Sequence, residues 1–288
     1  MRSMLLAKSR TLRHIHKDEE KQGEVVMYFY EELSADAEEY GRRGAEVVSI
    51  GKSGQGRDII CFGVGSGDKA IISTAGMHAR ECVSALVVKK QLEYALEHEP
   101  KCRQYFIPLV NPDGAEIVKE GLATGDRRKQ LWKANAAGVD PNVNFDANWG
   151  TGKCNTFVAG SENYVGKKPF SEEESAVIAR FTEQCGARLT LSYHTAGREL
   201  YWYFFQTRNY ERDFEIAAYV EKTLKYKYKR IDGDCASAGG YKDWCVQKLG
   251  IPAFTIELGE GRHPLRAEDI AEDIALNEKL VSKLEKYI

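Results

Sequence analysis

The sequence predicts an α/β fold, a single-domain three-layer α/β/α sandwich with a mixed, largely parallel central sheet. Segments rich in β-branched and aromatic residues alternate with segments of helical periodicity along most of the chain. Several strand segments are continuously apolar, which is typical of a sheet buried on both faces. A chain of 288 residues with 43% hydrophobic content can bury such a core. We therefore expect one folded domain, residues 23–288, preceded by a charged arm of residues 1 to about 22.

The first half of this domain is expected to begin with an amphipathic helix within residues 25–43. Three short β-rich runs, separated by glycine-containing turns, follow at residues 45–51, 57–64 and 69–76. A helix is then expected from about Arg80 to Leu96. The apolar run at 105–114 predicts a further strand that ends in the turn residues Asn-Pro-Asp-Gly.

The second half opens with residues 126–169, which are rich in Asn, Gly and Asp and predict little regular structure. Loops of this length inside a compact domain are usually functional. Regular secondary structure is expected again from a helix at 171–184, which begins with the capping sequence Ser-Glu-Glu-Glu. The remaining expected elements are strands at 187–194, near 199–205 and at 253–259, and helices at 211–224, at 239–250 and from about 267.

The overall charge and the cysteines limit the possible partners and location. With 41 basic and 43 acidic side chains, the chain has no broad attraction for nucleic acid or for an anionic membrane, so neither partner is expected. Seven cysteines without a CxxC pair fit reduced thiols. The N-terminal apolar stretch is too short for the core of a signal peptide, so a cytoplasmic location is expected. The sequence does not indicate an oligomeric state.

Three candidate functional residues lie where expected strands end: His78, His194 and Glu257. In α/β sheets the active site gathers at such strand ends. Glu81, three positions after His78, can point the same way, and His194 could supply a third metal ligand. Glu257 would then be free to accept a proton from a metal-activated water. Without further context, a surface histidine, a hydrogen-bonded core histidine and a solvated glutamate remain the alternative interpretations.

Several motifs along the chain favour the metal-site interpretation together. In chain order, the motifs are GMHARE, NPDG, GVDPNVNFDANWG, SENYVGKKPFSEEES, SYHTAGRELYWYF, SAGGYKDW and IPAFTIELG. From about Val47 to the C-terminus, this series resembles the zinc metallocarboxypeptidases of the carboxypeptidase A type. Several independent motifs in one order make the resemblance highly specific.

The resemblance implies a one-zinc peptidase. It implies Glu257 as the catalytic glutamate and Arg80 as a substrate-binding residue. The family's oxyanion-stabilising arginine aligns best with Lys133. Lysine carries its positive charge on a single ammonium group, whereas the guanidinium of arginine can bind oxygen atoms through two parallel N–H groups. The implied zinc ligands are His78, Glu81 and His194.

The chain departs from the family pattern where the substrate is held. Where the family has an Asn-Arg pair that binds a terminal carboxylate, this chain has Asn142 and Val143, so the guanidinium is missing. Cys235 falls where the family has the tyrosine of a mobile loop, although Tyr241 is close in the sequence and is expected to contact substrate. Lys242 occupies the position at the base of the side-chain pocket. Either this lysine faces an acidic group of the substrate, or it lies at a helix start and faces water.

A bacterial branch of the same family, the γ-D-glutamyl-diaminopimelate peptidases of cell-wall peptides, is similar in its GGxKDW and FTIE segments, and the departures described above favour this branch. Diaminopimelate carries a second carboxylate, which Lys242 could meet. A metallocarboxypeptidase that releases acidic C-terminal amino acids is the first alternative. A non-catalytic peptide-binding protein on a peptidase fold is the second, and bound zinc would argue against it.

Overall fold

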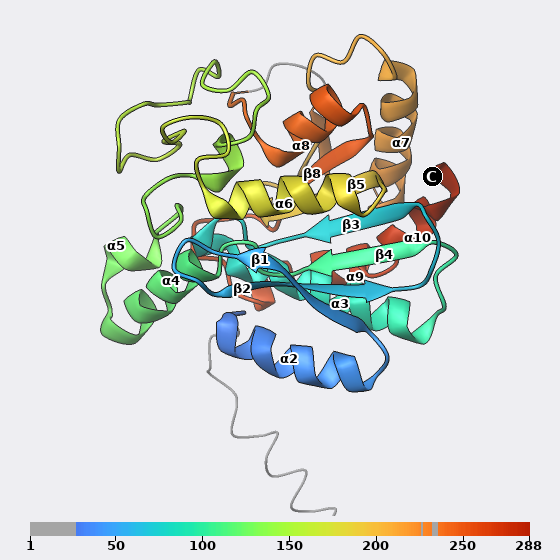
Figure 1. Ribbon diagram of the computed structural model, residues 1–288, viewed down its shortest axis with the longest axis horizontal. Helices are drawn as coiled ribbons and strands as arrows, with labels where there is room; N and C mark the ends of the chain where they lie inside the picture. Colours follow the sequence, from blue (N-terminus) through green and yellow to red (C-terminus); the bar gives the residue numbers. More distant parts are fainter. Residues whose placement is uncertain (1–26, 226, 232–235) are drawn as a thin grey trace, which may run out of the picture.

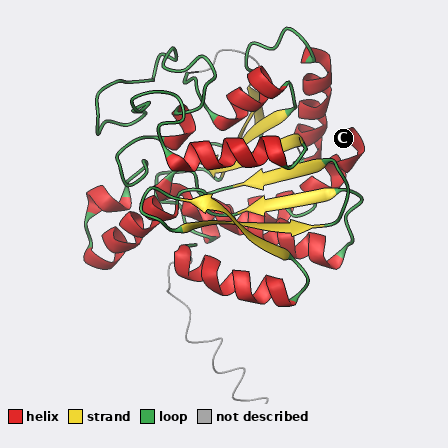
Figure 2. Cartoon of the chain, viewed as in Figure 1, coloured by secondary structure: helices red, strands yellow, loops and turns green. Residues whose placement is uncertain are grey.

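The computed structural model describes residues 27–225, 227–231 and 236–288 of the chain. The charged arm expected over residues 1–22 lies outside the described residues. The described part forms helices packed on both sides of one twisted sheet (Figures 1 and 2).

The sheet has eight strands in the spatial order β1-β2-β4-β3-β5-β8-β6-β7 among the described residues. Its centre is parallel, because β3 pairs in parallel with both β4 and β5, and β5 pairs in parallel with β8. The pairs β1/β2, β2/β4 and β6/β8 are antiparallel, which makes the sheet mixed, as predicted. The strands are β1 (Glu46–Lys52), β2 (Asp58–Val64), β3 (Ala70–Thr74), β4 (Arg103–Ile107), β5 (Ala187–Thr195), β6 (Glu199–Tyr201), β7 (Lys229–Ile231) and β8 (Ala253–Leu258).

Helices complete the sandwich on the two faces of this sheet (Figure 1). No helix of the described ranges is long and apolar enough to cross a membrane. The helices are α2 (Tyr30–Arg42), α3 (Ala85–Glu97), α4 (Pro112–Thr124), α5 (Arg127–Gln130), α6 (Glu173–Gln184), α7 (Tyr210–Thr223), α8 (Tyr241–Trp244), α9 (Ala271–Asn277) and α10 (Leu280–Leu284).

Two apolar cores lie on opposite faces of the sheet. The larger core takes buried side chains from α2, α3, α7 and α10, such as Leu33, Val88 and Val220. The smaller core takes them from α6 and α8, such as Ile178 and Trp244. In α3 the buried positions recur at helical spacing, and β5 is buried along nearly its whole length, as a central strand covered on both faces must be. The predicted three-layer fold is confirmed.

The main error of the sequence prediction is at residues 105–114. The strand β4 ends at Ile107, and the Asn-Pro-Asp-Gly residues begin the unpredicted helix α4 instead of a turn. Asn111 is its N-cap and accepts a hydrogen bond from the Gly114 N–H, while Pro112 takes the first helical position. The same residue types start turns and cap helices, so local chemistry alone did not distinguish the two.

Candidate active site

The site lies where the central parallel strands end. After β3, the chain turns at Gly76, whose φ of +61° and close approach to Leu109 leave no room for a side chain. The chain then enters a 3₁₀ segment, Ala79–Ser84, that presents His78 and Glu81 on one side. On the neighbouring strands, His194 of β5 is directly paired with Glu257 of β8. The fold therefore brings the four candidate residues to one edge of the sheet.

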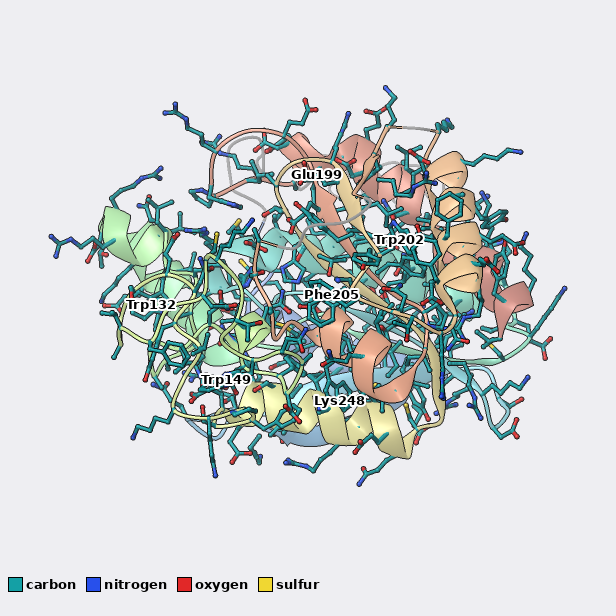
Figure 3. The ribbon with its side chains drawn as sticks, turned by 90° about the horizontal axis from the view of Figure 1, so that it is seen from above. Trp132, Trp149, Glu199, Trp202, Phe205 and Lys248 are labelled. Carbon is teal, nitrogen blue, oxygen red and sulfur yellow. The ribbon has the colours of Figure 1, made fainter. Side chains whose placement is uncertain are left out.

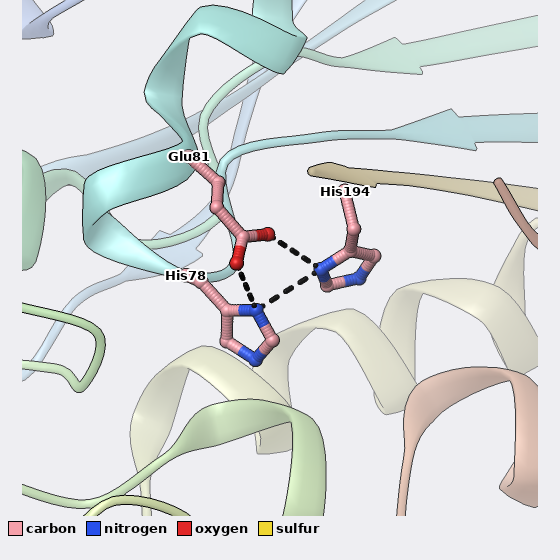
Figure 4. Close-up of side chains that lie close together, drawn as sticks. All are labelled: His78, Glu81 and His194. Carbon is pink, nitrogen blue, oxygen red and sulfur yellow. Dashed lines mark hydrogen bonds and ion pairs between the residues drawn. The ribbon is translucent and has the colours of Figure 1, made fainter. Parts of the chain in front are cut away.

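Three of these side chains converge on one point (Figure 4). The Nδ1 atom of His78 lies 3.0 Å from Oε1 of Glu81, and Nδ1 of His194 lies 3.0 Å from Oε2 of the same carboxylate. The two Nδ1 atoms are 3.1 Å apart. All three residues are buried. This is the cluster expected from the sequence as the metal ligands.

Further groups fix the orientation of the two imidazoles. The Nε2 atom of His78 lies 3.1 Å from Oδ1 of Asp140, which can accept its proton and leave the Nδ1 lone pair directed at the cluster. The Nε2 atom of His194 lies 3.1 Å from Oγ of Ser192. The Thr195 N–H donates to Glu81 at 3.2 Å. These partners hold the three donor groups facing one another.

The electrostatics of the cluster favour a cation at its centre. Burial disfavours the charge on Glu81, yet the two histidines hold the pKa of this carboxyl well below its usual value. Burial alone would lower the pKa of His78, but the carboxylates of Glu81 and Asp140 outweigh it and raise the pKa to about 9. Burial lowers the pKa of His194, which keeps this imidazole neutral. Without a metal, a proton on His78 supplies the positive charge that the carboxylates require.

The donor set fits zinc. Two imidazole nitrogens and one carboxylate are typical ligands of catalytic zinc, with the fourth position left for water or substrate. At Zn–N distances near 2 Å, tetrahedral ligand atoms lie about 3.3 Å apart. The separations of 3.0 to 3.1 Å between the facing atoms of His78, Glu81 and His194 are close to this value. The chemistry and the spacing of the cluster therefore agree.

A cavity of about 200 Å³ opens beside the cluster. Glu257 and Lys133 both line it, together with His78. Burial and the nearby negative charge of Glu81 raise the pKa of Glu257 to about 8. Lys133 is held by Asp140, with 2.7 Å between Nζ and Oδ2. The cavity thus places a proton acceptor and a cation next to the metal ligands.

Two expected substrate-binding residues also line the cavity, Asn142 and Lys242. The Oδ1 atom of Asn142 accepts from the Tyr241 N–H, and its Nδ2 atom lies 3.4 Å from Nε2 of His194. The Nζ atom of Lys242 donates to the Tyr203 carbonyl at 2.9 Å and lies 2.6 Å from Oδ1 of Asp243. Lys242 therefore does not face open water, although Asp243 offsets part of its charge.

The expected role of Tyr241 is not supported by its position. Its phenol is fully buried and forms a hydrogen bond with Thr182 of α6, at 2.7 Å, on the side away from the cavity. Tyr241 and Lys242 are consecutive in a helix, where neighbouring side chains diverge by about 100°. Of these two residues, Lys242 lines the cavity and Tyr241 does not. Cys235, the other residue at the family's tyrosine position, lies outside the described residues.

Arg80 does not line the cavity in this structure. Its guanidinium donates to Oε1 of Glu162 at 2.6 Å and to the Leu131 carbonyl at 3.3 Å. Val143 is buried in a 3₁₀ turn, so no cation takes the place of the missing arginine at that position. Contact between Arg80 and a substrate would require the Glu162 pair to open.

The sequence reasoning missed Asp140, Ser192 and Tyr201. Asp140 precedes a proline in the long irregular segment, and nothing in its neighbours signals that it faces His78. Ser192 and Tyr201 could have been found by strand alternation. Ser192 lies two residues before His194 on the same face of β5, and Tyr201 lies opposite the cavity-lining Thr255.

A two-histidine, one-carboxylate cluster beside a free glutamate, at the strand ends of an α/β sandwich, defines a metal-dependent hydrolase. Residues 29–278 match the zinc carboxypeptidase family, and the chain belongs to this family. The family is one of zinc peptidases, and the His-Glu-His cluster of this chain agrees with a metal site of that kind. The alternative of a non-catalytic binding protein is therefore not supported.

Two relatives show what the sequence is similar to. The γ-D-glutamyl-L-diamino acid endopeptidase 1 of Lysinibacillus sphaericus is 29% identical over 236 residues, which cover 70% of this chain and 57% of the relative. The uncharacterized protein YqgT of Bacillus subtilis (strain 168) is 32% identical over 173 residues, covering 55% of this chain and 46% of that protein. The chain thus spans about half the length of these relatives.

Solved structures support the fold. Bovine thrombin-activatable fibrinolysis inhibitor, in complex with tick carboxypeptidase inhibitor, superimposes with a TM-score of 0.77 at 21% identity, over 92% of this chain and 99% of the other. The murein-tripeptide amidase MpaA of Escherichia coli O157 gives a TM-score of 0.58 at 20% identity, over 84% and 95% of the two chains. At these identities the likeness concerns the fold alone.

Proposed function

We propose that this chain hydrolyses the γ-D-glutamyl–diaminopimelate bond of bacterial cell-wall peptides. The observation that carries the proposal is Lys242, which lines the cavity beside Glu257 while the position of the carboxylate-gripping arginine is taken by the buried Val143. The similarity to a γ-D-glutamyl-L-diamino acid endopeptidase supports it.

The chain's own residues can divide the work of hydrolysis. Zinc held by His78, Glu81 and His194 would supply Lewis acidity and a lowered pKa for a coordinated water. Glu257, whose pKa is raised to about 8, is suited to accept a proton near neutral pH and return it to the leaving amine. Lys133 lies at the cavity wall, where its charge can stabilise a developing oxyanion.

The substrate argument rests on charge. A peptidase that releases ordinary C-terminal residues needs a cation near the scissile bond for the terminal carboxylate. Position 143 supplies none, and Lys242 lies at the other wall of the cavity, beside Tyr203 and Asp243. A carboxylate carried by the leaving residue's side chain would reach Lys242. Asn142, which lines the cavity, is proposed to contact the same residue, and Arg80 to contact substrate once released from Glu162.

Turnover of cell-wall peptides in the cytoplasm is part of the same proposal. The six cysteines of the described residues are all free, which agrees with a reducing compartment. A metallocarboxypeptidase that releases acidic C-terminal residues remains the second candidate, because Lys242 would also suit the side chain of a C-terminal glutamate.

The test compares two substrates with zinc-loaded enzyme and identifies the products by mass spectrometry. One substrate is a γ-D-glutamyl-diaminopimelate peptide, and the other is an N-blocked dipeptide that ends in glutamate. We expect cleavage of the first, and a Glu257→Gln variant that retains zinc but loses turnover by about two to four orders of magnitude. Cleavage of the glutamate dipeptide alone would favour the second candidate, and near-normal turnover by Glu257→Gln would contradict the role of Glu257.

A further inference from the structure

Glu199 lies on the cavity side of the sheet, next to the catalytic glutamate. Strand β6 pairs antiparallel with β8, so that Glu199 is directly opposite Glu257 and Tyr201 is directly opposite Thr255. Residues directly opposite one another in a sheet point to the same face. Tyr201, Thr255 and Glu257 all line the cavity, so the Glu199 carboxylate belongs to the same face (Glu199 is labelled in Figure 3).

Among the side chains that the structure describes, Glu199 forms no ion pair with a lysine or arginine; the side chain of Lys229, the residue opposite Glu199 on β7, is not among them. Its neighbour in sequence, Arg198, turns away and pairs with Glu272 at 2.8 Å and Asp273 at 3.3 Å. Glu199 instead accepts a hydrogen bond from the hydroxyl of Tyr201, which lines the cavity. Burial and Glu81 contribute most to the raised pKa of Glu257, and the charge of Glu199 adds to them. Glu199 thus adds negative charge on the face of β6 and β8 that carries Glu257.

The α8 wall of the cavity carries the positive charge. Lys242 is buried, and its ammonium group has three donors, of which two are directed at Tyr203 and Asp243. One donor remains for a ligand. Asp243 offsets part of the charge of Lys242, so a carboxylate at this wall would meet an acidic side chain and a partly neutralised cation. The other cavity-lining lysine, Lys133, is paired with Asp140 beside the metal ligands. A substrate that also carries a cation matches this arrangement better.

We propose that Glu199, with Tyr201, binds an ammonium group of the substrate while Lys242 binds a carboxylate. The cavity then selects a leaving residue whose side chain ends in both groups, and discriminates against one that ends in an ammonium or a carboxylate alone. This inference rests on the proposed peptidase function, and it assigns the choice among diamino acids to Glu199. Glu199 is a specificity residue for binding and does not take part in proton transfer.

The test measures binding of free amino acids to the zinc-loaded enzyme by calorimetry, so that it does not depend on which bond is cleaved. The probes are three amino acids that differ at the end of the side chain. The side chain of meso-diaminopimelate ends in both an ammonium and a carboxylate, that of L-lysine in an ammonium only, and that of L-2-aminopimelate in a carboxylate only. The variants are Glu199→Gln and Lys242→Met. Glu183→Gln, an exposed residue of α6, is the matched control.

We expect diaminopimelate to bind wild type at least about tenfold more tightly than either single-group probe. Glu199→Gln should weaken diaminopimelate and lysine by about tenfold and leave aminopimelate unchanged, whereas Lys242→Met should weaken diaminopimelate and aminopimelate and leave lysine unchanged. Equal losses for all three probes, or no loss, would overturn the inference. Correct binding without cleavage of the γ-D-glutamyl peptide would instead contradict the proposed function.

Discussion

At the scale of single residues, the site depends on carboxylates kept in different protonation states. Asp140 accepts from His78 and is paired with Lys133, and these two cations hold its pKa below the usual range although burial opposes this. Glu257 forms no ion pair with a side chain that the structure describes, and burial together with the charge of Glu81 raises its pKa to about 8. Environments that push the pKa values of neighbouring carboxyls apart mark which one exchanges protons during a reaction.

The pH dependence of hydrolysis should report the ionisation of Glu257. The ionised form is the proton acceptor, so kcat/KM should rise with pH and level off once this carboxyl is deprotonated. Because a divalent cation at His78, Glu81 and His194 offsets the charge of Glu81, the midpoint should lie below the value of about 8 found without metal. The measurement is kcat/KM from about pH 5 to pH 9 at saturating zinc. Glu183→Gln should give the same profile, and a rate that falls over this range would mean that the protonated form is required.

At the scale of elements, the sequence predicted what periodicity and strand ends reveal. The continuously apolar β5 and β8 were recognisable, and His194 and Glu257 could be placed near their ends. Helix α4 was not recognisable from the sequence, because Asn111 and Pro112 are residue types that start turns as readily as helices. The orientation of Tyr241 could not be predicted either, since it depends on contacts with Phe145 and Thr182 from distant segments.

Helix α4 allows a test of how its start supports the metal ligands. The Asn111 side chain accepts from the Gly114 N–H and donates to the carbonyls of Met77 and Ala134, and it is fully buried. Asn111→Ala removes a cap worth about 1 kcal/mol and leaves two buried carbonyls with fewer partners, at about 1–3 kcal/mol in total. We expect the free energy of unfolding of the metal-free protein in urea to fall by about 2–4 kcal/mol.

The control for this variant is Asp126→Ala, at the exposed N-cap of the short helix α5. Asp126 accepts from the Arg128 and Lys129 N–H groups but supports no buried carbonyl. It should cost no more than about 1 kcal/mol. Because Met77 precedes His78, only Asn111→Ala should also weaken zinc binding. Equal costs for the two variants would show that the buried bonds of Asn111 contribute little.

At the scale of the whole molecule, the metal ligands join segments that are far apart in sequence. His78 and Glu81 follow β3, and His194 belongs to β5, the two parallel strands at the centre of the sheet. Both strands contribute to the cores on the two faces, for example through Ile71 and Leu191 on one side and Ile72 on the other. A metal at this point therefore connects parts of the fold that unfold together.

Removal of zinc should lower the stability of the whole domain. A ligand that binds only the folded state at one hundred times its Kd adds about 2.7 kcal/mol. In a chain of this size each kcal/mol shifts Tm by about 2–4 °C, so chelation should lower Tm by roughly 5–10 °C. The measurement is thermal unfolding with zinc and with a chelator, alongside His78→Ala. This variant should unfold at the same temperature in both conditions, because a carboxylate and one imidazole hold zinc far more weakly than three ligands do. A full zinc-dependent shift in His78→Ala would place the metal elsewhere in the molecule.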